Sequence, residues 1–146
     1  MTQSQSQELA PIVANLITEN NRLSFLPTFF GQHLMIRGEA LVFGWLDRLS
    51  EDYSGGYWHF YTLTNGGFYL ALASDKLMHI SVEGNGFDGE MSADAAGIMA
   101  TLFALGQLAG EVQGTDSGDV LIDRYYFLRD FALDHAEARL IFKAID

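Results

Sequence analysis

The feature that most constrains the fold is a run of 22 residues, Tyr53–Ser74, that contains no Asp, Glu, Lys or Arg. Its centre holds Asn65-Gly66, a dipeptide that favours the tight turn of a β-hairpin. A second reversal is expected at Asp75-Lys76, which would place three strands in antiparallel succession. The predicted strands, rich in aromatic and β-branched residues, are Tyr57–Thr64, Phe68–Ala73 and Leu77–Glu83. Because both faces of these strands are largely apolar, the sequence predicts a three-stranded meander packed between helices.

Helical periodicity surrounds this segment. Apolar residues spaced three and four apart predict helices at Glu8–Glu19, Glu39–Leu49, Ser92–Val112 and Asp119–His135, followed by a last turn or two. Ser92 is a suitable N-cap, and Asp94 would lie in the first turn, where a carboxylate suits the helix dipole. We expect a polar N-terminus with a short helix over residues 1–21, and a single α+β domain over residues 22–146.

Basic residues are scarce. The chain has 8 Lys and Arg against 19 Asp and Glu, which gives a formal net charge of −11. An average domain of this length carries about 18 residues of each sign, so the acids are at a normal level and the bases are at less than half of theirs. We therefore expect neither nucleic-acid binding through a basic face nor attachment to a membrane through basic residues.

No targeting or membrane segment is expected. The first basic residue is Arg22, which disfavours a secretory signal peptide. The uncharged stretch Ala95–Gly110 is shorter than the roughly 20 residues that cross a bilayer, so a helix in the middle of a core fits it better. The lack of cysteine suits a reducing compartment. These features predict a cytoplasmic protein.

One motif suggests an alternative function, a small hydrolase or nucleotide-binding enzyme that uses the Gly84–Glu90 loop with His59 and His79. The loop matches the G-x-G-x-x-G pattern of dinucleotide-binding proteins, but that fingerprint needs a parallel βαβ unit, and the strands here are predicted to be antiparallel. The meander would place both histidines on one face, flanking Leu72 and about 10 Å apart, too far to share a zinc ion. No catalytic residue, cofactor or metal is expected.

The shortage of bases is concentrated between Lys76 and Arg124, where 47 consecutive residues contain no Lys or Arg. Two interpretations fit this stretch, a solvated acidic rim or a docking surface for a basic partner. The second assigns partner binding to Asp88, Glu90 and Asp94. An extended DNA mimic is not expected. Duplex DNA as long as this domain is wide carries about 22 phosphates, whereas the whole chain has a net charge of −11.

Seven strings follow one another over residues 22–146, and the most specific of them runs from Gly55 to Tyr69. The strings are Arg22–Gly31, Gly44–Ser50, Gly55–Tyr69, Gly84–Gly86, Ser92–Gly97, Leu128–Leu133 and His135–Ala138. Together they resemble the plasmid-borne antirestriction family of the ArdB/KlcA type. The resemblance implies a small cytoplasmic protein of mobile elements that relieves the restriction of incoming DNA by type I restriction-modification enzymes. It implies no catalytic residues.

We therefore expect an antirestriction protein that acts by protein binding rather than by catalysis. Its partner would be the type I restriction-modification complex or an accessory host protein, bound directly or indirectly, and the oligomeric state is left open. The aromatic segment Phe25–Phe30, together with Arg37, would form a second contact surface if it is exposed.

Overall fold

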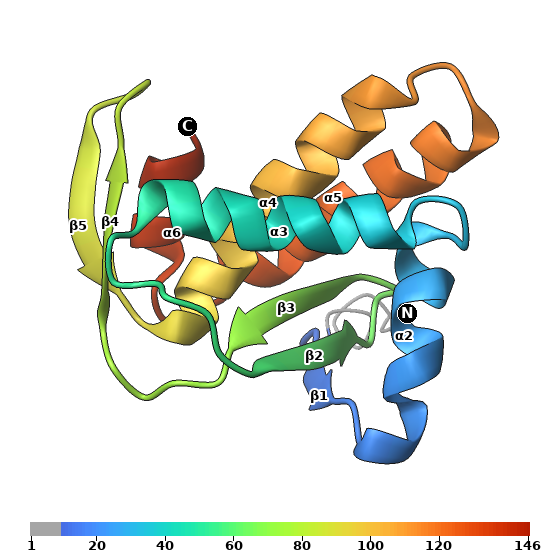
Figure 1. The fold of residues 1–146 in the computed structure, drawn as a ribbon, viewed down its shortest axis with the longest axis horizontal. Coiled ribbons are helices and arrows are strands. Elements are labelled where there is room, and N and C mark those ends of the chain that lie inside the picture. The colour runs from blue at the N-terminus through green and yellow to red at the C-terminus, as the bar shows by residue number, and fades with distance from the viewer. Residues whose placement is uncertain (1–9) are drawn as a thin grey trace, which may run out of the picture.

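The Asn65-Gly66 dipeptide forms the β-hairpin turn that the sequence predicts. In the computed structural model, which describes residues 10–146, the Asn65-Gly66 turn joins strand β2 (Trp58–Leu63) to strand β3 (Phe68–Leu72) in antiparallel register (Figure 1). Gly66 has a φ of 99°, which glycine adopts without strain. The Asn65 side chain accepts a hydrogen bond from the Gly67 backbone N–H at 3.0 Å. Interactions within the turn itself are therefore sufficient to explain its conformation.

The third strand of this sheet is not the predicted one. Strand β1 (Ala14–Leu16) pairs with β2, so the order of the sheet is β1-β2-β3. The strand predicted at Leu77–Glu83 does form, as β4 (Met78–Val82), but it pairs with β5 (Phe87–Met91) in a second antiparallel sheet. A three-stranded antiparallel sheet is thus confirmed, whereas the assignment of its third strand is wrong.

A helix at the outer edge of β3 explains this division into two sheets. Helix α4 (Ala93–Glu111) packs against β3, and the Thr101 hydroxyl accepts a hydrogen bond from the Leu70 backbone N–H at 3.2 Å. The two elements are so close that a Cβ atom on Gly97 would lie 2.3 Å from the Leu70 carbonyl oxygen. The backbone N–H that a further strand would bind at Leu70 is therefore already paired.

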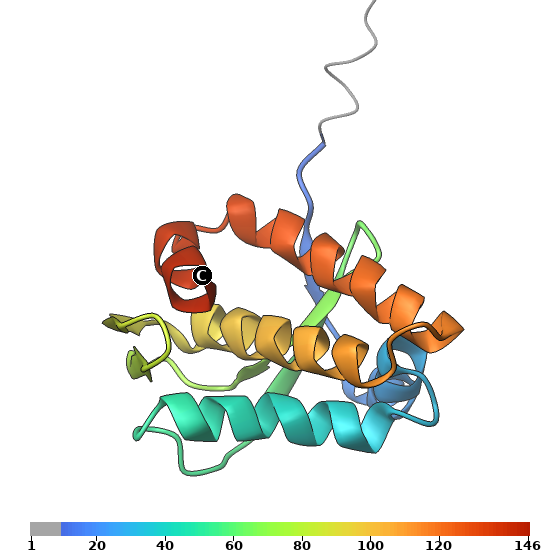
Figure 2. The same ribbon diagram turned by 90° about the horizontal axis from the view of Figure 1, so that it is seen from above.

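Helix α4 is the core helix. The Ser92 side chain caps it, as predicted, by accepting a hydrogen bond from the Ala95 N–H at 3.0 Å. The helix is long and apolar enough to cross a membrane, but 72% of its most apolar 18-residue stretch is buried inside the protein. Figure 2 shows α4 between α3 (Met35–Leu49) and α5 (Asp116–Leu133). The prediction of a core helix over Ala95–Gly110 is confirmed.

The predicted helix at Glu8–Glu19 is wrong where the structure describes it. Strand β1 takes its place, and a 3-10 helix, η1, follows at Glu19–Asn21. The Val13 N–H donates to the Thr64 hydroxyl at 2.9 Å, and the Thr64 N–H donates to the Val13 carbonyl at 3.0 Å. Pairing with the sheet thus overrides helical periodicity. The predicted polar tail at residues 1–7 and the start of that helix lie outside the described residues.

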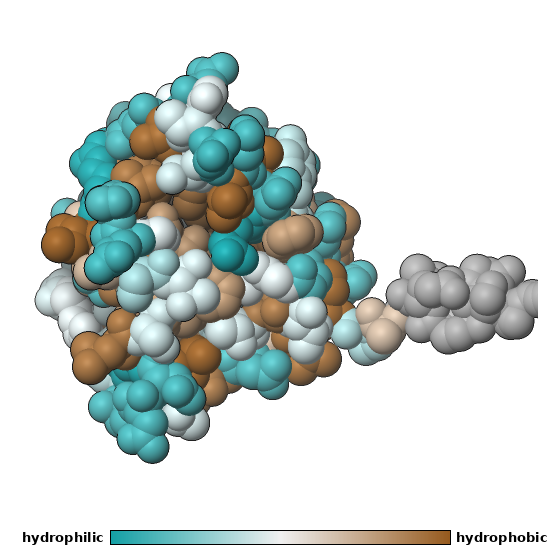
Figure 3. Space-filling view, turned by 90° about the vertical axis from the view of Figure 1, so that its right-hand side faces the viewer, coloured by the Kyte–Doolittle hydropathy of each residue, from teal (hydrophilic) through white to brown (hydrophobic). Residues whose placement is uncertain are grey.

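The remaining helices complete a single α+β domain, which confirms the predicted fold class. Helix α2 (Arg22–Phe30) runs through Pro27, α3 begins one turn before the predicted Glu39, and α6 (Ala138–Ile145) follows α5. On the side of the molecule shown in Figure 3, apolar and polar residues alternate in small patches rather than forming one continuous apolar face.

Candidate functional site

Two of the three acids predicted to bind a partner, Asp88 and Glu90, lie on the outward face of β5. Side chains alternate along a strand, so these two face solvent while Met91 is buried in the core. In the register of the hairpin, Glu90 lies opposite His79, and Asp88 lies opposite Ser81. The His79 imidazole also lies beside the Asp88 carboxylate at ion-pair distance, and at least half of each side chain is exposed. The β4–β5 hairpin therefore presents an acidic, solvent-accessible face.

The Gly84–Gly89 motif belongs to this hairpin and not to a nucleotide-binding loop. Its first residues form the turn between β4 and β5, and the rest lies within β5. The Asn85 side chain accepts a hydrogen bond from the Phe87 N–H at 2.9 Å and donates one to the Ala144 carbonyl at 2.8 Å, which fastens the turn to the end of α6. Phosphate binding by this motif needs a strand-to-helix turn, and the segment forms a strand-to-strand turn instead.

The third acid, Asp94, has a different environment. It lies in the first turn of α4, where its carboxylate accepts hydrogen bonds from the Tyr69 hydroxyl at 2.7 Å and from His135 at 2.8 Å. Burial by itself would raise the pKa of Asp94, but the hydrogen bonds from His135 and Tyr69 outweigh it and hold this pKa below its usual value. Burial, together with the neighbouring Asp94 charge, raises the pKa of Tyr69. Asp94 is therefore held in its ionised form by groups of the protein itself.

Both ring nitrogens of His135 are occupied. Nδ1 accepts a hydrogen bond from the Glu137 backbone N–H at 2.9 Å, which places the ring proton on Nε2, the atom that faces Asp94. The Glu137 carboxylate in turn accepts a hydrogen bond from the Ser92 N–H at 2.8 Å. An Asp–His pair is part of the hydrolase triad, but there the second nitrogen takes the proton of a nucleophile. Here that nitrogen binds the backbone, and the pair joins α4 to the α5–α6 connection.

The two histidines of the enzyme alternative lie in different sheets. His59 is on β2 and His79 is on β4, so they do not flank Leu72 on one face. That expectation is wrong because β4 pairs with β5 rather than with β3. His59 lines a shallow groove of 510 Å³ together with Tyr61 and Asp94. Within residues 10–146, no three His, Asp or Glu side chains are placed to hold one metal ion.

The aromatic segment of α2 is mostly core. Phe25 and Phe30 are buried, and the Phe25 ring stacks on Phe60 with centroids 4.6 Å apart. Arg37 donates two hydrogen bonds to the Glu111 carboxylate, at 3.1 and 2.6 Å. Of this second candidate surface, Phe25 and Phe30 are therefore withdrawn into the core, whereas Arg37 stays exposed beside Glu111.

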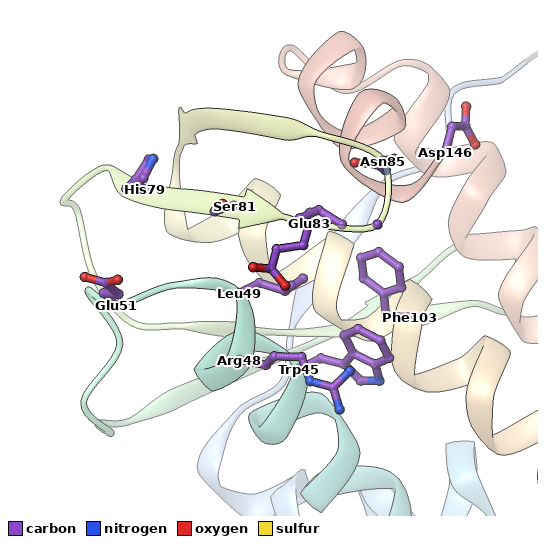
Figure 4. A pocket seen from close by; sticks show the side chains of 12 residues that line it. Trp45, Arg48, Leu49, Glu51, His79, Ser81, Glu83, Asn85, Phe103 and Asp146 are labelled. Carbon is purple, nitrogen blue, oxygen red and sulfur yellow. The ribbon is translucent and has the colours of Figure 1, made fainter.

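A groove between α3 and β4 is the site that sequence reasoning missed (Figure 4). It has a volume of 820 Å³ and is called the Trp45 groove below. The rings of Trp45 and Phe103 stack with centroids 4.5 Å apart, and the Arg48 guanidinium lies 4.5 Å from the centre of the Trp45 ring. The spacing of Trp45 and Arg48 on one helix face was a usable signal. Phe103 comes from another helix, and only the fold brings it to the groove.

Comparisons with known proteins agree on one family. The sequence model of the family described as antirestriction protein matches residues 51–146. An antirestriction protein KlcA from Escherichia coli is 63% identical over 136 residues, which cover 93% of this chain and 96% of that protein. A second KlcA from Escherichia coli is 60% identical over 139 residues, which cover 94% of this chain and 95% of that protein.

A solved structure matches the fold over 100% of both chains, with a TM-score of 0.87 and 57% sequence identity. That structure is described as one of the KlcA and ArdB proteins, which show a novel fold and antirestriction activity against type I DNA restriction systems in vivo but not in vitro. Fold and surface together define a small α+β protein with an acidic hairpin beside an open groove. The chain belongs to the antirestriction protein family.

Proposed function

We propose that this protein relieves the restriction of incoming DNA by type I restriction-modification systems. The observation that carries the proposal is the agreement in fold and sequence, over the whole chain, with the structure of the KlcA and ArdB proteins. We place this activity in the cytoplasm, where incoming DNA meets restriction enzymes. A chain without cysteine is suited to that reducing compartment.

The proposed mode of action is protein binding rather than catalysis. Three observations support it: the occupied ring nitrogens of His135, the placement of His59 and His79 in different sheets, and the use of the Gly84–Gly89 motif as a hairpin turn. The partner is the type I restriction-modification complex or an accessory host protein, and contact with either accounts for relief of restriction.

The proposed contact surface is the acidic face of the β4–β5 hairpin. Asp88 and Glu90 are its direct contacts because both project from a strand into solvent. Asp94, whose side chain is 39% exposed and hydrogen-bonded through both oxygens, supports the surface by fixing the start of α4. This surface is local, and the net charge of −11 is too small for a mimic that runs the length of the molecule.

The test compares how well unmodified phage plates on a type I restricting host with and without this protein. Expression is expected to raise the efficiency of plating on that host and to leave plating on a non-restricting host unchanged. Equal plating on the restricting host would contradict the proposed function.

A second arm tests the contact surface with the double variant Asp88→Lys, Glu90→Lys. Its matched control is Asp130→Lys, Asp134→Lys, which makes the same change of charge at exposed positions near the end of α5. The first variant is expected to lose protection and the second to keep it, with both proteins folded. Full protection by the first variant would exclude the hairpin face as the contact.

A further inference from the structure

One edge of β4 has no partner strand. In an antiparallel pair, successive residues direct their backbone groups alternately toward the partner strand and away from it. Val82 directs its carbonyl toward the β5 side, where it accepts from the Gly86 N–H at 2.9 Å, and His79 directs its N–H away, to the Asp52 carboxylate at 2.8 Å. Ser81 lies two residues after His79 in the same strand, so its N–H and carbonyl also point away from β5. Among residues 10–146, no other segment donates to or accepts from the Ser81 backbone.

This open edge forms one wall of the Trp45 groove. Ser81 and Glu83 line the groove from the side of β4, and Trp45 and Leu49 line it from the C-terminal half of α3 (Figure 4). Its volume of 820 Å³ lies in the range of about 300–1,000 Å³ that is typical of ligand-binding pockets. An extended chain lying in the groove would therefore meet the free backbone N–H and carbonyl of Ser81 on β4.

The floor of the groove is aromatic and rigid. The Trp45 indole N–H donates to the Gln107 side chain at 3.0 Å, and the ring is held between Phe103 and the Arg48 guanidinium. Trp45 and Phe103 are only partly buried. Trp and Arg are the residue types that most often dominate binding at protein interfaces. Such a floor offers an anchoring position for one apolar side chain.

The rim of the groove is acidic. Glu51 and Glu83 are exposed at its edge, and Arg48 is the cation among its lining residues. The chain as a whole carries a net charge of −11. An occupant with Lys or Arg beside its apolar anchor complements this rim, whereas a polyanion such as nucleic acid is repelled by it.

We propose that the Trp45 groove binds an extended segment of a protein partner, which adds as a strand to the free edge of β4. Ser81 would form both main-chain hydrogen bonds of one residue pair, an apolar side chain of the segment would contact Phe103, and a Lys or Arg would face Glu51 and Glu83. This inference rests on the proposed function only in expecting the segment to come from the restriction system.

In the direct test, short overlapping synthetic peptides that cover the subunits of a type I restriction enzyme are titrated into the 15N-labelled protein. Binding is monitored by the NMR signals of its N–H groups. A binding peptide is expected to combine apolar and basic residues and to shift the Ser81 amide and the Trp45 indole N–H. Absence of any peptide that shifts these two signals would overturn the proposal.

A matched pair of variants tests the strand addition. Ser81→Pro removes the outward N–H and blocks an incoming strand, but it leaves the β4–β5 ladder intact because that N–H is not part of it. Ser81→Ala retains the N–H and is the control. Peptide affinity is expected to fall about ten-fold or more in Ser81→Pro and to be unchanged in Ser81→Ala. Glu83→Lys, at an exposed turn position, is expected to weaken binding without any change to the strand.

Phage plating separates this inference from the proposed function. Loss of protection in Ser81→Pro and Glu83→Lys, with Ser81→Ala protective, would support both. Full protection by Ser81→Pro would overturn the groove as the contact while the antirestriction function stands, whereas no protection by the unaltered protein would contradict the function itself. If the protein sediments as a dimer and Ser81→Pro dissociates this dimer, the occupant of the groove is a second copy of the chain. That result would overturn the proposal that the groove binds a segment of another protein.

Discussion

His135 donates a hydrogen bond to Asp94 at 2.8 Å, across the junction between the start of α4 and the chain that leads into α6. Tyr69, on β3, donates to the other oxygen of the same carboxylate at 2.7 Å. One side chain thus joins three elements that are far apart in the sequence. The first two predictions concern what this carboxylate contributes to stability.

Asp94→Asn is expected to lower the free energy of unfolding by about 1–3 kcal/mol, because hydrogen bonds to a charged, partly buried group are lost or weakened. Urea denaturation measures the difference. Asp88→Asn is the control, since that exposed side chain is expected to change stability by no more than about 0.5 kcal/mol. Equal losses in the two variants would refute a special role for Asp94.

The lowered pKa of Asp94 predicts a loss of stability in acid. The folded state prefers the ionised carboxylate, so this contribution is fully present above the unfolded pKa of about 3.9. It is lost as the pH falls from there through the lower folded value. The free energy of unfolding, measured over this range, should fall less steeply in Asp94→Asn than in the unaltered protein. Parallel curves would contradict the assignment.

Thr101 is expected to be essential to the edge of β3. Thr101→Val keeps the shape of the side chain but leaves the buried Leu70 N–H without its partner, which should cost about 1–3 kcal/mol. Amide exchange at Leu70 should accelerate in parallel. Thr101→Ser retains the hydroxyl and should preserve the protection of that amide, so similar exchange rates in both variants would argue against the hydrogen bond.

Gly97 is predicted to be irreplaceable, for reasons of space. In Gly97→Ala the new Cβ would lie 2.3 Å from the Leu70 carbonyl oxygen and 2.6 Å from the Ala71 Cα, so the helix and strand must separate. We expect a loss of about 1–3 kcal/mol or more, seen as a lower Tm. Gly110→Ala, in the same helix with nothing within 4 Å of the new Cβ, should instead raise stability by about 0.5–1 kcal/mol.

Sequence reasoning predicted the elements whose signals are local. The Asn65-Gly66 turn and the Ser92 cap both depend on contacts within a few residues, and both form as expected. The division into two sheets depends on the contact between Leu70 and Thr101, 31 residues apart. Nothing near either residue in the sequence indicates that a helix will take the place of a strand.

The candidate site shows the same limit. The outward orientation of Asp88 and Glu90 follows from strand alternation once the strand is known. The Trp45 groove could not be predicted in this way, because Trp45 and Phe103 belong to different helices. The apolar sequence of α4 does not indicate which of its positions stays open to solvent.

The separation of the two sheets has a consequence for how such a family can diversify. Because β4 and β5 share no strand with the other sheet, changes at their outward positions leave the β1-β2-β3 ladder untouched. The inward positions Met78, Ile80 and Met91 still fasten the hairpin to the core. Substitutions can therefore accumulate on the exposed face of the hairpin while the rest of the domain is inherited unchanged.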